Sequence, residues 1–332
     1  MPTSDNAKIE YEASQSLVAM VALTDSGDAT QFDSADELWS NKSGFAPSVK
    51  PDGVVTGFVI STDAANDKVN IAAGTLYQAG VLQSVGAAAD EAIARPTLAN
   101  IIYSITVNSS QAIAVVAGTE KAGSFDTTRG AAGGPPLIAV GSTEIGQVKL
   151  SSATPGLILA SEIKQVIGTS QERYDFPSNN QQRINVTSGV QANAGVVFVS
   201  ALPLTHTGVI PKAVYAEYYT PEFAELPNAT DFVPAETTNS VTSTQVYNNT
   251  IGASSSTLNQ STFTFFPNDG ITDAIFKEKD ENLFFKFKQD RLNDPFILQQ
   301  GKFGIARTFP AADSVQVSAT VSTEEAAVEV AS

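Results

Sequence analysis

Apolar and polar residues alternate along much of this chain, and this period of two is the feature that most restricts its fold. The clearest example is the segment 314–322, in which every second residue is Val or Ala. In the segment 283–289, two phenylalanines alternate with two lysines after the leading Leu-Phe pair. Successive side chains of a β-strand point to opposite faces of the sheet, so the pattern predicts a mainly β protein.

Other segments share this pattern and are rich in β-branched and aromatic residues, which favour strands. We expect further strands at 53–60, 69–72, 75–85, 100–107, 112–117, 212–219 and 261–266. Breaks that contain Gly, Asn and Asp separate the strands of the first half. Short strands at this spacing are typical of a small sandwich or barrel.

Signals for helices are few. The segment Asp33–Trp39 begins with capping residue types and has acidic residues in its first turn, which predicts a short helix. A second short helix of two turns is expected at Thr272–Lys279, with Thr272 as its candidate cap. The stretch 237–260 is rich in Ser, Thr and Asn, and it predicts a long loop or an extended hairpin.

Changes in composition divide the chain near residue 165. Gly130–Pro136 joins flexible and stiff residues, as connections often do, and Ser151–Gly156 is a second break. A chain of 332 residues has room for about two domains. We expect an N-terminal segment at 1–50, a β-rich domain at 51–165 and a second β domain at 166–332.

Charge and residue content exclude several functions. Lys and Arg number 19 against 35 Asp and Glu, giving a net charge of −16, which argues against binding nucleic acid through its phosphates. The chain has no Cys, so disulfides, thiol chemistry and Cys-based zinc sites are excluded. We find neither a signal-peptide pattern nor an apolar run that would span a bilayer, and we expect a soluble, non-exported product.

No motif for catalysis is present. The sequence contains no P-loop, nucleophile elbow, zincin helix or dinucleotide fingerprint. Its single histidine, His206, would need distant carboxylates to bind a metal, and we interpret it as an ordinary loop or core histidine. We therefore expect no enzyme activity, no catalytic residue, no cofactor and no metal.

The charges are distributed unevenly along the second half. Seven acids and no bases lie between Lys212 and Lys277, whereas the segment 277–307 has seven bases and five acids. Solvated surface charge is one interpretation, and a self-complementary assembly in which acidic and basic surfaces of neighbouring subunits meet is the other. The candidate interface acids are Glu217, Glu222, Glu225, Asp231 and Glu236, and the candidate inter-subunit bases are Lys286, Lys288 and Arg291.

Four stretches of the chain point to a known family. They are Ser261–Asp273, Phe296–Phe309, Glu37–Pro47 and Gly133–Val140. In these stretches the sequence resembles the major tail tube proteins of long-tailed (siphovirus-type) double-stranded DNA bacteriophages. The likeness extends over much of the chain, but the family shares a fold and has no short invariant motif.

The resemblance implies a β-sandwich or barrel of the tail-tube type, with a short flanking helix and an additional small β-rich domain. In that family, subunits join their strands into closed rings, commonly hexameric, which stack with loops or hairpins bridging successive rings. The implied partners are further copies of the chain, a tape-measure protein, a tail-terminator protein and DNA in transit without specific binding. No membrane is involved, and the implied location is the virion tail, with assembly in the host cytoplasm.

The same resemblance gives the charged residues and the extra length a role. Many such tubes have an acidic lumen, so the acids at 217–236 become candidates for the lumen or the ring interface. The tube fold is much shorter than this chain, and we expect residues 51–165 to decorate the exterior of the tube. The segment 1–50 can still belong to the tube fold, which would make the extra domain an insertion.

Other functions stay open on the sequence alone. A baseplate, tail-terminator or fibre-adaptor protein would use similar β domains but would stop at one ring. A carbohydrate-binding or adhesin module would need exposed aromatic residues or a calcium site, and the sequence has no calcium loop. An enzyme is the least favoured alternative.

Overall fold

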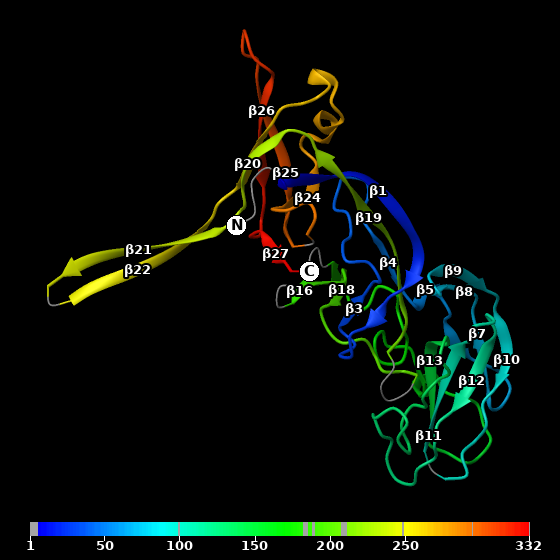
Figure 1. The fold of residues 1–332 in the computed structure, drawn as a ribbon. Helices are drawn as coiled ribbons and strands as arrows, with labels where there is room; N and C mark the ends of the chain where they lie inside the picture. The colour runs from blue at the N-terminus through cyan, green and yellow to red at the C-terminus, as the bar shows by residue number, and fades with distance from the viewer. Residues whose placement is uncertain are drawn as a thin grey trace.

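The chain is mainly β, as its period-two pattern predicts. A computed structural model describes residues 6–98, 100–181, 185–187, 190–206, 211–247, 249–293 and 295–331. Strands account for 52% of the chain and helical turns for 4%, and none of the described helices reaches seven residues. Figure 1 shows a large curled sheet, a long two-stranded arm that leaves it, and a separate β-rich body at the opposite end.

The largest sheet combines strands from both ends of the sequence, paired antiparallel throughout. Its order is β20 (Ala229–Val233), β23 (Ser261–Phe265), β26 (Gln316–Ser322), β25 (Phe296–Thr308), β24 (Asn282–Lys288), β1 (Lys8–Ala22), β19 (Val214–Leu226) and β4 (Ser48–Pro51), with β27 (Val328–Val330) beside β25. The N-terminal strand β1 therefore lies between two strands of the second half, β24 and β19.

This sheet curls back on itself. Phe232 on β20 stacks on Phe287 on β24 with 4.6 Å between ring centroids, although three strands separate β20 and β24 in the sheet order. Adjacent strands are about 4.8 Å apart, so a flat sheet would hold these strands about 19 Å apart. The concave face encloses the first core, which contains Ile9, Tyr11, Leu226, Phe263, Phe265, Ile275, Leu283, Phe285, Phe303, Val317, Ala319 and Val321.

Strands β1 and β19 are long enough to reach a second core. Beyond the curl they pack against a small sheet of β15 (Asn179–Gln181), β18 (Gly195–Phe198), β3 (Gln31–Asp33) and β2 (Thr24–Asp25). Trp39 stacks on Tyr218 of β19 with ring centroids 4.7 Å apart, and both side chains are buried. The pairing of β1 with β19 thus connects two hydrophobic cores.

The predicted helix at Asp33–Trp39 is wrong, because this segment forms the end of β3 followed by a bend. Its capping residue types make tertiary contacts instead of starting a helix. The Ser34 hydroxyl donates to the carbonyl oxygen of Ala194 at 2.7 Å, and the Tyr218 hydroxyl donates to the Asp36 carboxylate at 2.7 Å.

The second predicted helix exists as two short 3₁₀ turns, η3 (Gly270–Thr272) and η4 (Ala274–Glu278). Asp273, and not Thr272, caps η4, because its side chain accepts a hydrogen bond from the amide of Ile275. Ile275 is fully buried in the first core. The turn therefore adds two apolar side chains to the first core, those of Ile275 and of the partly buried Phe276.

The β-rich body holds a third core between residues 54 and 163. Its sheets are β5 (Gly53–Gly57), β8 (Gly74–Gln78) and β9 (Val81–Val85); β10 (Ala88–Ala92), β7 (Lys68–Ile71) and β6 (Ile60–Thr62); and β12 (Ile113–Ala117), β11 (Ile101–Val107), β13 (Thr143–Leu150) and β14 (Ile163–Lys164). The expected strand 75–85 is a hairpin that turns at Ala79 and Gly80, both with positive φ. Smaller elements are η2 (Ala160–Glu162), β16 (Asn185–Thr187) and β17 (Val190–Ala192).

The body is an insertion, because the chain enters and leaves it at one point. The amide of Val54 donates to the carbonyl oxygen of Glu172 at 2.8 Å, and Val54 forms a bridge with Arg173. Strand β4 of the large sheet ends at Pro51, two residues before β5 begins. We refer to residues 53–172 as the inserted body.

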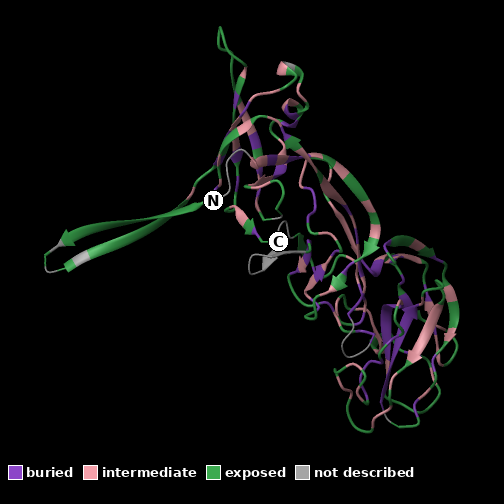
Figure 2. Cartoon of the chain, in the orientation of Figure 1, coloured by how far each residue is buried: buried purple, intermediate pink, exposed green. Residues whose placement is uncertain are grey.

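The stretch 237–260 forms the extended hairpin and not the long loop. Strands β21 (Thr237–Val246) and β22 (Asn249–Leu258) pair with each other over 10 residues each and with no other described strand. Figure 2 shows this hairpin exposed along nearly its whole length. We call it the hairpin arm.

The curled sheet should depend on its aromatic core. Phe303 is fully buried and packs against Phe263 and Phe285, so Phe303→Ala should lower the free energy of unfolding by about 3–5 kcal/mol. Phe309→Ala is the matched control, because Phe309 is 62% exposed and its loss should cost less than about 0.5 kcal/mol. Chemical denaturation measures both, and equal effects would contradict the proposed core.

Candidate assembly surfaces

The hairpin arm is an uncharged, exposed two-stranded ribbon. At about 3.4 Å per residue, its ten paired residues extend about 34 Å. Among the side chains of the arm that the structure describes, large apolar ones face solvent: Val241 is 76% exposed, Tyr247 104% and Ile251 58%. Hydroxyl groups link its strands, as in the 2.7 Å contact between Ser240 and Ser255. A two-stranded hairpin with no core is marginally stable in water, so a surface from another molecule would stabilise the arm.

The large sheet has strand edges that no described strand covers. Strand β1 pairs with β24 only from Lys8 to Tyr11, although it pairs with β19 as far as Ala22. Along this open edge Leu17 is 52% exposed and Val21 38%. An open edge offers unpaired amide and carbonyl groups to another chain.

The opposite end of the sheet is also open but is protected. Strand β20 pairs with β23 alone, and its register shifts between Thr230 and Val233. Asp231 occupies this bulge with a φ of 56°. A bulge and a charged residue on an edge strand are common devices against unwanted pairing, so this predicted interface acid has a local structural role as well.

Several predicted interface charges pair within the chain. Lys286 on β24, Glu10 on β1 and Glu225 on β19 lie opposite one another in three adjacent strands. Arg291 forms an ion pair with Glu225 at 2.9 Å, and Lys8 forms one with Glu10 at 2.5 Å. Charges of the acidic and basic segments of the sequence thus pair within the chain, across β24, β1 and β19.

Lys286 is held in an aromatic setting. Its ammonium group lies 4.1 Å from the ring centroid of Phe223 and 4.8 Å from that of Phe296. Burial lowers the pKa of Lys286, and the nearby carboxylates of Glu37 and Glu10 oppose this shift. The neighbouring candidate, Lys288, lies opposite Lys8 in the register.

The five candidate acids do not share one face. Strand β19 alternates regularly, so Glu217 and Glu225 point to one side and Glu222 to the other. Glu222 accepts a hydrogen bond from the Ser14 hydroxyl at 2.6 Å. Asp231 lies in β20, and Glu236 follows β20 at the base of the hairpin arm, with both side chains exposed.

One acid that the sequence gave no reason to select, Glu12, is fully buried beside these strands. It accepts hydrogen bonds from the Ser40 hydroxyl, from Gln15 at 2.9 Å and from the amide of Phe284 at 3.2 Å. Burial raises the pKa of Glu12, and these hydrogen bonds oppose the shift. Glu12 therefore ties β1 to β24 where their backbone pairing ends.

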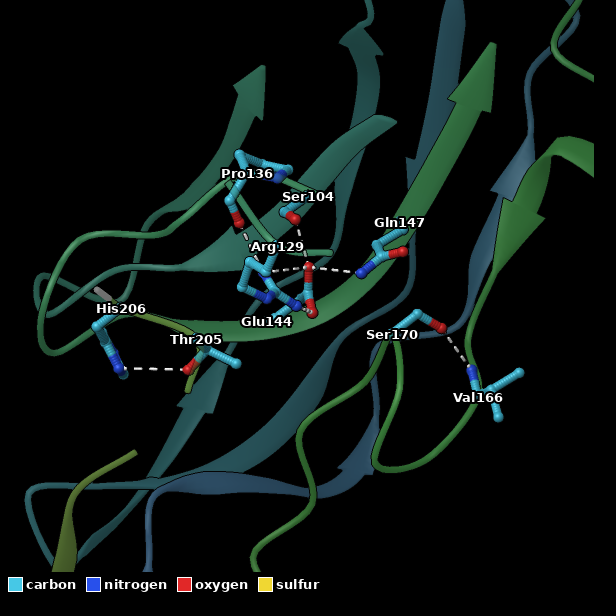
Figure 3. Close-up of polar contacts among 9 residues, drawn as sticks. All are labelled: Ser104, Arg129, Pro136, Glu144, Gln147, Val166, Ser170, Thr205 and His206. Carbon is cyan, nitrogen blue, oxygen red and sulfur yellow. Dashed lines mark hydrogen bonds and ion pairs between the residues drawn. The ribbon is translucent and has the colours of Figure 1, made fainter. Parts of the chain in front are cut away.

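His206 is buried, and it fits the structural interpretation that the sequence favoured. One ring nitrogen lies 3.1 Å from the carbonyl oxygen of Ser142, and the other lies 3.3 Å from the Thr205 hydroxyl (Figure 3). Burial lowers the pKa of His206, so the neutral ring is favoured. No group of three or more His, Asp or Glu that could hold a metal occurs among the described residues.

A scan against protein-family models found no match, and searches of curated proteins and of solved structures found no significantly similar protein. Within the described ranges, no helix has the length and apolar character needed to cross a membrane.

Because of its hydrogen bonds, Glu12 should contribute more to the free energy of unfolding than the exposed acids of this region. Glu12→Ala leaves the buried amide of Phe284 and the Ser40 hydroxyl without an acceptor, and it should lower the free energy of unfolding by about 1–3 kcal/mol. Glu222→Ala removes an exposed acid and should cost less than about 0.5 kcal/mol. If thermal and chemical denaturation ranked the two variants in the opposite order, the role of Glu12 would be wrong.

Proposed function

We propose that this chain is a structural subunit of a phage tail tube, which assembles into stacked rings around a lumen that conducts DNA. The observation that carries the proposal is the hairpin arm, together with the resemblance of the sequence to tail tube proteins. The arm is long, uncharged and exposed, and among the described strands its two strands pair only with each other. Contact with a neighbouring subunit would stabilise such an element, and an arm that bridges successive rings would make this contact.

The open edges of the large sheet give a route to ring closure. The sheet is already curled, β1 keeps an unpaired edge at 13–22, and β4, at the end of the sheet away from β20, pairs with β19 alone among the described strands. Pairing between the edges of neighbouring copies would satisfy these backbone groups and would remove exposed edges altogether. A ring of such copies needs no ligand or cofactor.

The charge of the chain suits a surface past which DNA moves. Duplex DNA carries about one negative charge per 1.7 Å of its axis, and a path lined with cations would hold it. A net charge of −16 per subunit gives repulsion that acts within a Debye length of about 8 Å. Ion pairs such as Arg291 with Glu225 also leave fewer free cations to bind phosphate.

The first test is assembly of the purified chain. Concentrated protein examined by negative-stain electron microscopy should form hollow filaments of uniform width. Single rings would favour a tail-terminator or fibre-adaptor protein, and monomers at all concentrations would favour a binding module such as an adhesin. Either of these outcomes would contradict the tube proposal.

The hairpin arm should be required for stacking and not for folding. The backbone amide of Asn259 donates to the carbonyl oxygen of Glu236 at 3.0 Å, so the two strands of the arm are adjacent at its base. Residues 238–257 can therefore be replaced by an Asn-Gly turn. The shortened chain should keep the melting temperature of the wild type but form no filaments. Leu292→Ser, which removes an 85% exposed apolar side chain from a different loop, is the control and should still form filaments.

The inserted body should be dispensable for the tube. Because Val54 and Glu172 are hydrogen-bonded neighbours, residues 54–172 can be replaced by a short Gly-Ser linker without stretching the sheet. We expect the shortened chain to fold and to assemble into thinner filaments, as measured by circular dichroism and electron microscopy. A folded variant that forms no filaments would show that the body contributes to assembly and is not only external.

A further inference from the structure

A group of buried charged side chains lies where the inserted body meets the large sheet. Three carboxylates belong to it, those of Asp52, Glu144 and Glu172, and each residue is at most 5% exposed. Two cations face them, Lys212, which is 1% exposed, and Arg129, whose side chain is 15% exposed. We call these five residues the junction cluster.

Each member comes from a different segment. Asp52 lies in the connection from β4 into the body, and Glu144 lies on β13. Arg129 belongs to the loop before β13, Glu172 to the segment that leaves the body, and Lys212 to the approach to β19. The cluster therefore includes a residue from the connection that enters the body, one from the segment that leaves it and one from the segment before β19.

Glu144 has a complete set of partners. Arg129 forms an ion pair with it at 2.5 Å, Gln147 donates to it at 3.1 Å, and the Ser104 hydroxyl donates to it as well (Figure 3). Arg129 also donates to the carbonyl oxygen of Pro136 at 2.7 Å. Arg129 and Glu144 are thus a closed, charge-balanced pair.

The other three members are less evenly matched. Lys212 donates to the carbonyl oxygens of Arg173 at 2.5 Å and Phe176 at 2.9 Å. Neither carboxylate oxygen of Glu172 accepts a well-formed hydrogen bond from a described residue, although the Thr205 hydroxyl lies beside it. Asp52 accepts the amide of Ala79 at 2.9 Å. The ammonium group of Lys212 therefore lies near two buried carboxylates, but it donates to backbone carbonyls and forms no direct ion pair with either carboxylate.

The remaining titratable neighbours do not restore the balance. Arg173 and Asp175 form their own ion pair at 3.0 Å, His206 is favoured in its neutral form, and Tyr215 is uncharged near neutral pH. With every acid and base of the junction cluster ionised, three negative charges would face two positive ones. A buried excess charge is costly, and binding one proton removes it.

We propose that the junction cluster is a proton-binding site, in which one proton on the pair of Asp52 and Glu172 holds the inserted body against the large sheet. Deprotonation leaves both buried carboxylates charged and weakens this docking, and burial raises the pKa of Glu172 as well. Burial, and the charge of Glu172, raise the pKa of Asp52 to about 7, while the amide of Ala79 and Lys212 oppose the shift. The site would therefore release its proton near neutral pH. The inference does not depend on the tube proposal.

The direction of the pH effect follows from linkage. An aspartate exposed by opening of the junction has its ordinary pKa near 3.8, whereas the closed form holds its proton up to a pH of about 7. Docking is therefore strongest at a pH below 3.8 and weakens as the pH rises to about 7. Above that value both forms are ionised, and the contribution of Asp52 no longer changes.

The test measures opening of the junction in the full chain by hydrogen exchange. The amide of Ile138 in the body donates to the carbonyl oxygen of Thr205 outside the body at 3.0 Å, and its protection factor, corrected for intrinsic exchange, gives the opening constant. Titration of Asp52 should make this opening constant rise about tenfold per pH unit between pH 5 and 7. Asp52→Asn, which keeps the acceptor for Ala79, should lower the slope of the logarithm of this constant by about one.

The matched control is Asp63→Asn. Asp63 also accepts a backbone amide, that of Ala65, but it lies on the exposed surface of the body, so the control should keep the wild-type slope. An unchanged slope in Asp52→Asn, or an equal loss in Asp63→Asn, would overturn the proposal. Infrared difference spectra of the wild type and of Asp52→Asn give a second measurement. A protonated carboxyl band that the wild type shows at pH 5.5 and Asp52→Asn lacks should disappear by pH 8.5, and identical carboxyl bands in the two proteins at pH 5.5 would overturn the proposal as well.

Discussion

The pairing of β1 with β19 is the interaction on which the rest of the structure depends. Lys8–Ala22 lies along Val214–Leu226 over nearly its full length, and these strands line both the curled sheet and the second core. The residues between them include the whole inserted body. This pairing brings together segments about two hundred positions apart, so its closure entropy must be offset by the two cores that it joins.

Sequence alternation predicted strands such as β26, whose two faces differ in burial. In β26, Val317, Ala319 and Val321 are buried as the period of two required. Strand β1 was missed, because its register shifts twice against β19, and each extra residue breaks the period. The helix at 33–39 failed for another reason. Ser and Asp stabilise bends as well as caps, and buried partners such as Ala194 and Tyr218 decided between them.

The charged residues illustrate a similar limit. Counting charges along the chain correctly found an acidic segment followed by a basic one, but strand register decides which of these charges meet. Arg291 reaches Glu225 because β24 and β19 flank the same strand. The junction cluster could not be predicted at all, since its five members are scattered from Asp52 to Lys212 and no spacing rule joins them.

The meeting of the two ends of the inserted body has an evolutionary consequence. A domain whose ends lie within hydrogen-bonding distance, as Val54 and Glu172 do, can be gained, lost or exchanged in one recombination event while the host sheet keeps its register. Selection on the inserted body is then separated from selection on the sheet. Related chains would be expected to differ most between residues 53 and 172 and least along β1 and β19.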